Sequence, residues 1–141
     1  MKLTSTKIAL GVILLLIVSL SAVIVIFNAR NRISEDDFVR NWSNVLEMQD
    51  DDTYFVYIYS DGCPACQQIR NEVLVFYRDE PSGINLYYLD VDNVSGAPSP
   101  TFSLTGVPAI IVVRDGVFVE TITGIPGIRD LFQAARDGEL N

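Results

Sequence analysis

The chain of 141 residues contains two cysteines, Cys63 and Cys66, with Pro64 and Ala65 between them. Two thiols at this spacing can interconvert between a dithiol and a disulfide, which is the chemistry of a redox-active pair. Three other interpretations compete with this one. A structural disulfide would close too short a loop to restrain the unfolded chain much. Zinc would need ligands from a second chain, because this one has no histidine. Finally, both thiols could be buried and inert.

The segment before the cysteines favours the redox interpretation. Residues 53–59, TYFVYIY, are almost all β-branched or aromatic, which is typical of a strand covered on both faces. Cys63 then falls where this strand ends and a helix begins, so unpaired N–H groups and the helix dipole are expected to favour its thiolate. Pro64 suits a first helical turn, where its missing N–H would be unpaired anyway. Cys66 is expected on the same side of the helix, more buried and within reach of Cys63.

Hydrophobic periodicity predicts three helices after residue 33. Ser34 is expected to cap a first helix that ends near Gln49. A second helix spans residues 67–78 and stops at Pro81-Ser82-Gly83, and a closing helix has Pro126 near its first turn. Their apolar faces are expected to consist of Phe38, Trp42, Val45 and Leu46, then Cys66, Ile69, Val73, Phe76 and Tyr77, and then Ile128, Leu131, Phe132 and Ala135. Asp50-Asp51-Asp52 is predicted to be a loop, with metal binding as the alternative.

Three further strands are predicted, at residues 84–91, 108–113 and 117–122. Asp115-Gly116 joins the last two as a two-residue hairpin turn, and residues 92–103 are expected to be a loop with one short helix. The first two strands flank a helix, which implies a parallel crossover. The sequence therefore predicts an α/β fold, with a mixed sheet of about four strands covered by helices on both faces.

Taken in this order, the motifs resemble the thioredoxin family. The resemblance covers about residues 35–140. It rests on Cys63-Pro64-Ala65-Cys66 after a buried strand, Leu89-Asp90-Val91-Asp92 ending the next strand, Gly106-Val107-Pro108 before a third, and Gly124 after the hairpin. It implies a thioredoxin fold and a thiol–disulfide oxidoreductase that uses no cofactor.

The resemblance also implies roles for individual residues. Cys63 would attack the substrate and Cys66 would resolve the mixed disulfide. Pro108 would be a cis-proline that packs against the pair, with the Val107 backbone holding an extended substrate segment. The supporting and substrate-binding residues would be Gly62, Pro64, Ala65, Val107, Pro108, Gly124 and Ile125.

The sequence departs from the family pattern at several positions. Gly62 stands where thioredoxins usually have tryptophan, and Pro-Ala replaces Gly-Pro between the cysteines. Tyr57 and Tyr88 occupy positions where the family usually buries an acid and often carries a lysine. Those groups help to move protons to the resolving cysteine, so Cys66 is expected to be a slower nucleophile here. Water or Asp61 would take the proton instead.

An apolar segment precedes the predicted domain. Residues 8–27 include no charged side chain, and a helix of that length spans a hydrocarbon core of about 30 Å. We expect a transmembrane anchor at 8–27, after a tail at 1–7 and before a linker at 28–34 and a thioredoxin-like domain at 35–141. A cleaved signal peptide and a buried core helix are the alternatives. The amino group, Lys2 and Lys7 outnumber Arg30 and Arg32, which favours a cytoplasmic N-terminus and an extracytoplasmic domain.

The charge of the domain excludes some partners. Residues 28–141 contain no lysine and carry 8 arginines against all 18 acidic residues of the chain, a formal net charge of −10. Nucleic-acid binding requires clustered basic residues, so no nucleic-acid partner is expected.

We expect the chain to be a single-pass protein of a bacterial cell membrane. It would be a thiol–disulfide oxidoreductase that acts on exported or cell-envelope proteins. Its partners would be cysteine-containing substrates and a redox partner protein. The alternative is a non-enzymatic accessory module that uses the same fold to bind a membrane or export complex.

Overall fold

The structure is a computed structural model that describes residues 2–30, 32–48, 52–79 and 82–140. The chain divides into two compact units, residues 1–33 and 34–141. Parts of three predictions lie outside the described residues. They are the end of the first helix, at Gln49, the aspartate loop, at Asp50 and Asp51, and the stop after the second helix, at Pro81.

The N-terminal unit is built on helix α1, Lys2–Arg30. Within it, Lys7–Asn28 contains an 18-residue window with a mean hydropathy of 3.1, and by length and composition this stretch is long and apolar enough to cross a membrane. Its two serines do not interrupt the helix, because the Ser19 and Ser21 hydroxyls each donate a hydrogen bond of 2.9 Å to the carbonyl three residues earlier. The side-chain donors are thus satisfied inside the helix, as an apolar environment requires.

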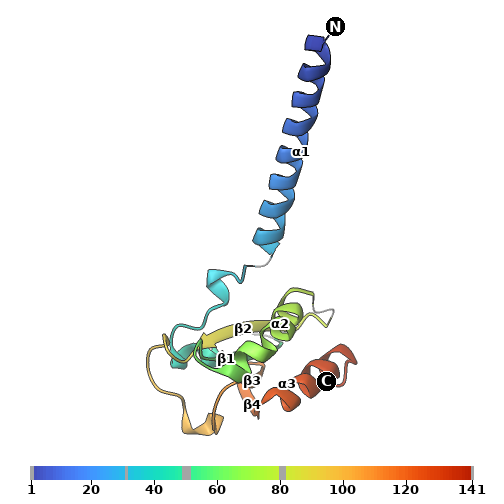
Figure 1. The fold of residues 1–141 in the computed structure, drawn as a ribbon. Coiled ribbons are helices and arrows are strands. Elements are labelled where there is room, and N and C mark those ends of the chain that lie inside the picture. Colours follow the sequence, from blue (N-terminus) through green and yellow to red (C-terminus); the bar gives the residue numbers. More distant parts are fainter. Residues whose placement is uncertain (1, 31, 49–51, 80–81, 141) are drawn as a thin grey trace. The chain divides into compact units, whose positions relative to one another are not determined.

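The second unit is organised around a four-stranded sheet (Figure 1). Its strands are β1 (Thr53–Tyr59), β2 (Asn85–Asp90), β3 (Ala109–Arg114) and β4 (Val117–Thr123). They lie in the order β2-β1-β3-β4, with β1 parallel to β2 and antiparallel to β3, and β3 antiparallel to β4. The predicted mixed sheet and its parallel crossover are confirmed. The continuous apolar run of β1 is explained by its central place, since residues 54–58 are buried on both faces.

One face of the sheet is covered by two α-helices, α2 (Pro64–Asp79) and α3 (Ile125–Arg136). The Phe76 ring stacks on Phe55 of β1 at 5.6 Å and on Phe132 of α3 at 4.1 Å between centroids. A bidentate ion pair between Arg129 and Glu72 also joins the two helices at the surface. The predicted apolar faces of both helices are buried, except that Tyr77 is half-buried.

The other face is covered by two short 3₁₀ helices, η2 (Trp42–Leu46) and η3 (Pro100–Phe102), and their connections. A further 3₁₀ helix, η1 (Glu35–Asp37), lies at the β2 edge, where the Tyr77 hydroxyl of α2 donates to the Asp37 carboxylate at 2.6 Å. Because side chains alternate along a strand, Tyr54, Val56 and Ile58 point to the face covered by η2 and η3. They form one core cluster with Val39, Trp42, Val45, Leu89, Phe102, Ala109, Ile111 and Val113.

The single helix predicted after Ser34 is wrong. Ser34 does cap η1 by accepting a hydrogen bond from the Asp36 N–H, but the chain then runs extended. Phe38 pairs with Tyr88 of β2, and the Val39 N–H donates to the Tyr88 carbonyl at 2.8 Å. The backbone groups that a helix would have used are therefore occupied by the sheet edge. The apolar spacing of this segment does not distinguish a helix from an extended strip that packs against a sheet.

The remaining predicted connections agree with the structure. Asp115 and Gly116 both have positive φ, at 51° and 71°, as a tight hairpin turn between right-twisted strands requires. The loop over residues 92–103 contains one short helix, η3. Strand β2 is shorter at both ends than the predicted 84–91.

The contact between α2 and the sheet gives a stability prediction. Replacing Phe76 with alanine removes a fully buried ring from between Phe55 and Phe132, so we expect Phe76→Ala to lower the free energy of unfolding by about 3–5 kcal/mol. Urea unfolding of the full chain in a nonionic detergent measures this change. The fluorescence of Trp42, the single tryptophan and a buried one, reports it.

The control for this experiment is the neighbouring residue, Val75, which is 46% exposed. Val75→Ala is expected to change the free energy of unfolding by less than about 0.5 kcal/mol. Equal losses in the two variants would contradict the assignment of Phe76 to the core.

Candidate active site

The two cysteines lie at the junction between β1 and α2, as the sequence predicts. Strand β1 ends at Tyr59, a short turn follows, and α2 begins at Pro64. The Cys63 N–H donates to the Ser60 carbonyl at 3.2 Å, which closes the turn. The Ser60 hydroxyl donates to the Asp92 carboxylate at 2.7 Å, and this bond ties the turn to the loop after β2.

Cys63 and Cys66 form a disulfide, with their Cα atoms 5.2 Å apart. The Cys66 N–H points at the Cys63 sulfur from 3.0 Å. Such a donor at a helix N-terminus stabilises negative charge on that sulfur once the disulfide opens. Cys63 is half-buried, whereas Cys66 is only 4% exposed. An incoming substrate therefore reaches Cys63 first.

A second loop lies against the pair. The Val107–Pro108 peptide bond is cis, and the Cys63 sulfur is 3.6 Å from the Val107 carbonyl oxygen. The Gly124 N–H donates to the Pro108 carbonyl at 2.9 Å, so the start of α3 is held beside this loop. Gly124 has φ of 84° and ψ of 160°, a conformation that only glycine adopts readily.

The structure thus brings the sequence-predicted site residues to one region, although their roles in binding stay predictions. Pro108 is buried; Ala65, Val107, Gly124 and Ile125 are half-buried; Gly62 and Pro64 are exposed. The space around Gly62 is open, with the Ser60 hydroxyl 3.9 Å from where a Cβ would stand. The glycine is therefore not required sterically in this structure.

The layer beneath α2 contains tyrosines in place of charged groups. Tyr57 and Tyr88 are register partners on β1 and β2. Their rings form a cluster with Tyr59 and Tyr77, with centroids between 5.5 and 6.3 Å apart. Burial raises the pKa of Tyr57 to about 12 and raises that of Tyr88 further. Both hydroxyls therefore remain protonated at neutral pH.

This layer has a consequence for Cys66, which is on the buried face of α2. Among the described residues, no aspartate, glutamate, lysine or arginine side chain is buried. No carboxylate in the described core can therefore accept the Cys66 proton. The exposed Asp61, the substitute named from the sequence, is held to the start of α2 by the Gln67 amide, which donates to its carbonyl at 3.0 Å.

Several residues near the site are not identified by sequence reasoning. The bond between Ser60 and Asp92 joins two loops 32 residues apart, and only the shared sheet edge could have suggested it. Phe38 lies beside Tyr88, which the erroneous first helix obscured.

Comparisons with known proteins agree with this geometry. The thioredoxin family model matches residues 36–137. Among curated protein sequences, none matches the chain significantly.

Among solved structures, the thioredoxin of Trypanosoma brucei brucei is 17% identical, with a TM-score of 0.59 over 79% of this chain and 95% of that one. The thioredoxin of Malassezia sympodialis is 15% identical, with a TM-score of 0.58 over 70% and 91%. Oxidised mitochondrial thioredoxin 3 of Saccharomyces cerevisiae is 19% identical, with a TM-score of 0.55 over 71% and 92%. At these identities the likeness shows the fold.

The uncharged layer beneath α2 predicts a pH dependence for the step in which Cys66 attacks. A thiol that gives its proton only to solvent is mostly protonated at neutral pH, and its thiolate fraction then grows about tenfold per pH unit. The rate of this step should therefore rise about tenfold per pH unit between pH 6 and 8. Reaction with an aryl disulfide releases one coloured thiol when Cys63 attacks and a second when Cys66 attacks. The rate of the second release, followed by stopped flow, measures this step.

Tyr57→Phe is the matched variant, because it removes a hydroxyl that stays protonated throughout this pH range. We expect the same slope as in the unmodified chain. A flat profile in the unmodified chain, or a profile that becomes steeper in Tyr57→Phe, would show that a protein group accepts the proton.

Proposed function

The chain belongs to the thioredoxin family and is a thiol–disulfide oxidoreductase, and we propose that it acts on exported or cell-envelope proteins while anchored in a membrane. The observation that carries the proposal is that one chain contains both features. A Cys63–Cys66 disulfide lies at the start of α2, and a separate helix, α1, is long and apolar enough to span a bilayer.

The exchange follows from the position of the two sulfurs. In the reduced form the Cys63 thiolate attacks a substrate disulfide, forms a mixed disulfide and releases one substrate thiolate. The Cys66 thiolate then attacks the Cys63 sulfur, which restores the Cys63–Cys66 disulfide and releases the second substrate thiol. Two electrons pass to the substrate. The reverse sequence oxidises a substrate dithiol, and in either direction a redox partner protein must reset the pair.

The substrate would lie across the two loops that flank Cys63. Val107 presents its carbonyl 3.6 Å from the Cys63 sulfur, and Ile125 follows Gly124 at the start of α3. We propose that Val107, Gly124 and Ile125 form the apolar lip of this site, with the Val107 backbone bonding to an extended substrate segment. Pro108 would hold that backbone in place.

The location belongs to the same proposal. We assign residues 8–27 to the anchor, 28–34 to a linker and 35–141 to the catalytic domain, on the outer side of a bacterial cell membrane. The absence of charge between Lys7 and Asn28 supports the anchor. The orientation rests on the positive charges before the anchor.

A trapping experiment in cells tests the function and the location together. Cys66→Ser removes the resolving thiol, so we expect mixed disulfides between Cys63 and substrate proteins to accumulate and to appear as reducible bands on non-reducing gels. In intact cells, Cys63 of this variant should also react with a thiol reagent that does not cross membranes.

Cys63→Ser is the matched control, because it keeps one thiol of the pair but removes the more accessible one. It should trap no partner. If the two variants trap alike, Cys63 is not the attacking residue. If Cys63 reacts with the impermeant reagent only after lysis, the domain lies on the cytoplasmic side.

A further inference from the structure

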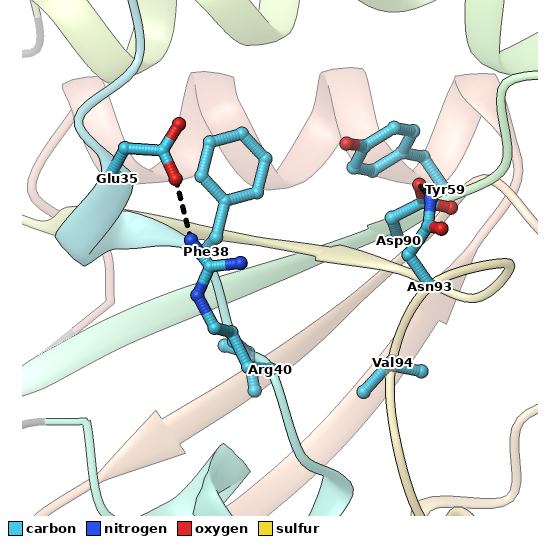
Figure 2. A pocket seen from close by; sticks show the side chains of 8 residues that line it. Glu35, Phe38, Arg40, Tyr59, Asp90, Asn93 and Val94 are labelled. Atoms are coloured by element: carbon cyan, nitrogen blue, oxygen red, sulfur yellow. Dashed lines mark hydrogen bonds and ion pairs between the residues drawn. The ribbon is translucent and has the colours of Figure 1, made fainter.

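A cavity of about 370 Å³ opens where β1 ends, just before the turn that leads to Cys63 (Figure 2). One side comes from the extended segment near η1, and the other comes from the ends of β1 and β2 and the loop that follows. The lining residues are Glu35, Phe38, Val39, Arg40, Tyr59, Asp90, Asn93 and Val94. Strands β1 and β2 are parallel and end together here, and this edge is where α/β sheets commonly bind ligands.

The cavity lies within reach of a substrate bound at Cys63. Tyr59 precedes Cys63 by four residues, so the backbone of the two is at most about 14 Å apart. The turn closed between Cys63 and Ser60 shortens that distance. A polypeptide that reacts at Cys63 can therefore place a side chain here from up to about four residues away.

Among the described residues, one carboxylate of the cavity wall, that of Asp90, forms no ion pair. The Arg40 guanidinium forms an ion pair with Glu35 at 2.6 Å, which Figure 2 shows as a dashed line. Asp90 accepts hydrogen bonds from the Asp92 N–H at 3.0 Å and from the Asn93 amide at 2.5 Å. Both of these donors are uncharged, and each carboxylate oxygen can accept a further bond.

The electrostatic environment of Tyr59 agrees with this picture. Burial is the main cause of its raised pKa, the charges of Asp90 and Asp61 raise it further, and Arg70 lowers it. Both carboxylates therefore act on the Tyr59 hydroxyl from nearby.

Aromatic rings provide the apolar part of the wall. Phe38 lies on the side of the ion pair and Tyr59 on the side of Asp90 (Figure 2). Between them, the buried Tyr88 ring contacts both, at 5.8 Å from Phe38 and 6.3 Å from Tyr59. A carboxylate next to aromatic rings matches a cation carried on an aliphatic stem, such as a lysine or arginine side chain.

We propose that this cavity binds a lysine or arginine side chain of the substrate protein, located up to about four residues from the reacting cysteine. The inference rests on the proposed function, because it needs a polypeptide bound at Cys63. It makes Asp90 a specificity-determining residue for the exchange reaction, whose chemistry is unchanged.

The test compares two peptide substrates with the full chain in a nonionic detergent. The chain is first reduced, and the reductant is removed. Two symmetrical disulfide-linked peptides of equal length are then offered, one with arginine on both sides of its cysteine and the other with glutamine. In a single turnover the protein dithiol becomes the Cys63–Cys66 disulfide, and each peptide disulfide becomes two peptide thiols.

We expect the arginine peptide to react about five- to tenfold faster at low ionic strength. The advantage should shrink at about 0.5 M salt, because screening weakens the attraction between partly exposed charges.

Three variants distinguish the cavity from the general negative charge of the domain. Asp90→Asn should lower the ratio of the two rates about three- to fivefold. Arg40→Gln leaves Glu35 uncompensated and should raise the ratio about two- to threefold. Asp79→Asn makes the same change in charge at the other end of α2, about 24 Å along the helix from Cys63, and should leave the ratio unchanged.

The two opposite shifts keep the test informative if one variant folds poorly, since damage to the fold would not raise the ratio. Equal rates for the two peptides, or equal effects of Asp90→Asn and Asp79→Asn, would overturn the cavity proposal and leave the oxidoreductase function standing. If neither peptide reacts, the proposed function and the cavity proposal both fail.

Discussion

Strand β1 pairs with a neighbouring strand along each edge and is buried on both faces. The position of its last residue is therefore fixed by the sheet. The turn that leaves it carries Cys63 directly to the first residues of α2. There the Cys66 N–H meets the Cys63 sulfur. The cis-proline loop before β3 and the start of α3 are brought to the same point by the β1–β3 pairing and by the bond from Gly124 to Pro108. A reactive sulfur can be held this way without any charged group in the described core.

The two cysteines lie in different electrostatic environments. Cys63 is half-buried and follows an exposed turn, and the Cys66 N–H points at its sulfur, where it favours the thiolate. Cys66 is buried on α2, and no charged side chain of the described residues is buried with it. In the proposed function, the attack by Cys63 would therefore depend on the helix terminus, whereas the attack by Cys66 would depend on exchange of a proton with solvent. The two steps respond to different parts of the sequence.

Much of this fold could be predicted from the sequence, because the relevant signals are local. The β-branched and aromatic run of β1, the Asp115-Gly116 turn and the apolar spacing of α3 each specify one element, and the cysteine spacing identifies the reactive pair. The prediction of a first helix was wrong because the apolar spacing also suits an extended segment. Hydrogen bonds to β2 hold this segment in the extended conformation. The same non-local pairing formed the cavity beside Asp90, whose walls come from segments about 50 residues apart in sequence.

The proposed function requires above all that the Cys63–Cys66 disulfide can be exchanged. The direct test is the reduction potential of the pair in the full chain, held in a nonionic detergent and equilibrated with glutathione redox buffers, with the dithiol and disulfide forms separated after alkylation. We predict reversible equilibration at a potential between about −270 and −120 mV, the range of redox-active members of this fold. A pair that stays oxidised until the buffer is more reducing than about −300 mV would behave as a structural disulfide and would contradict the account.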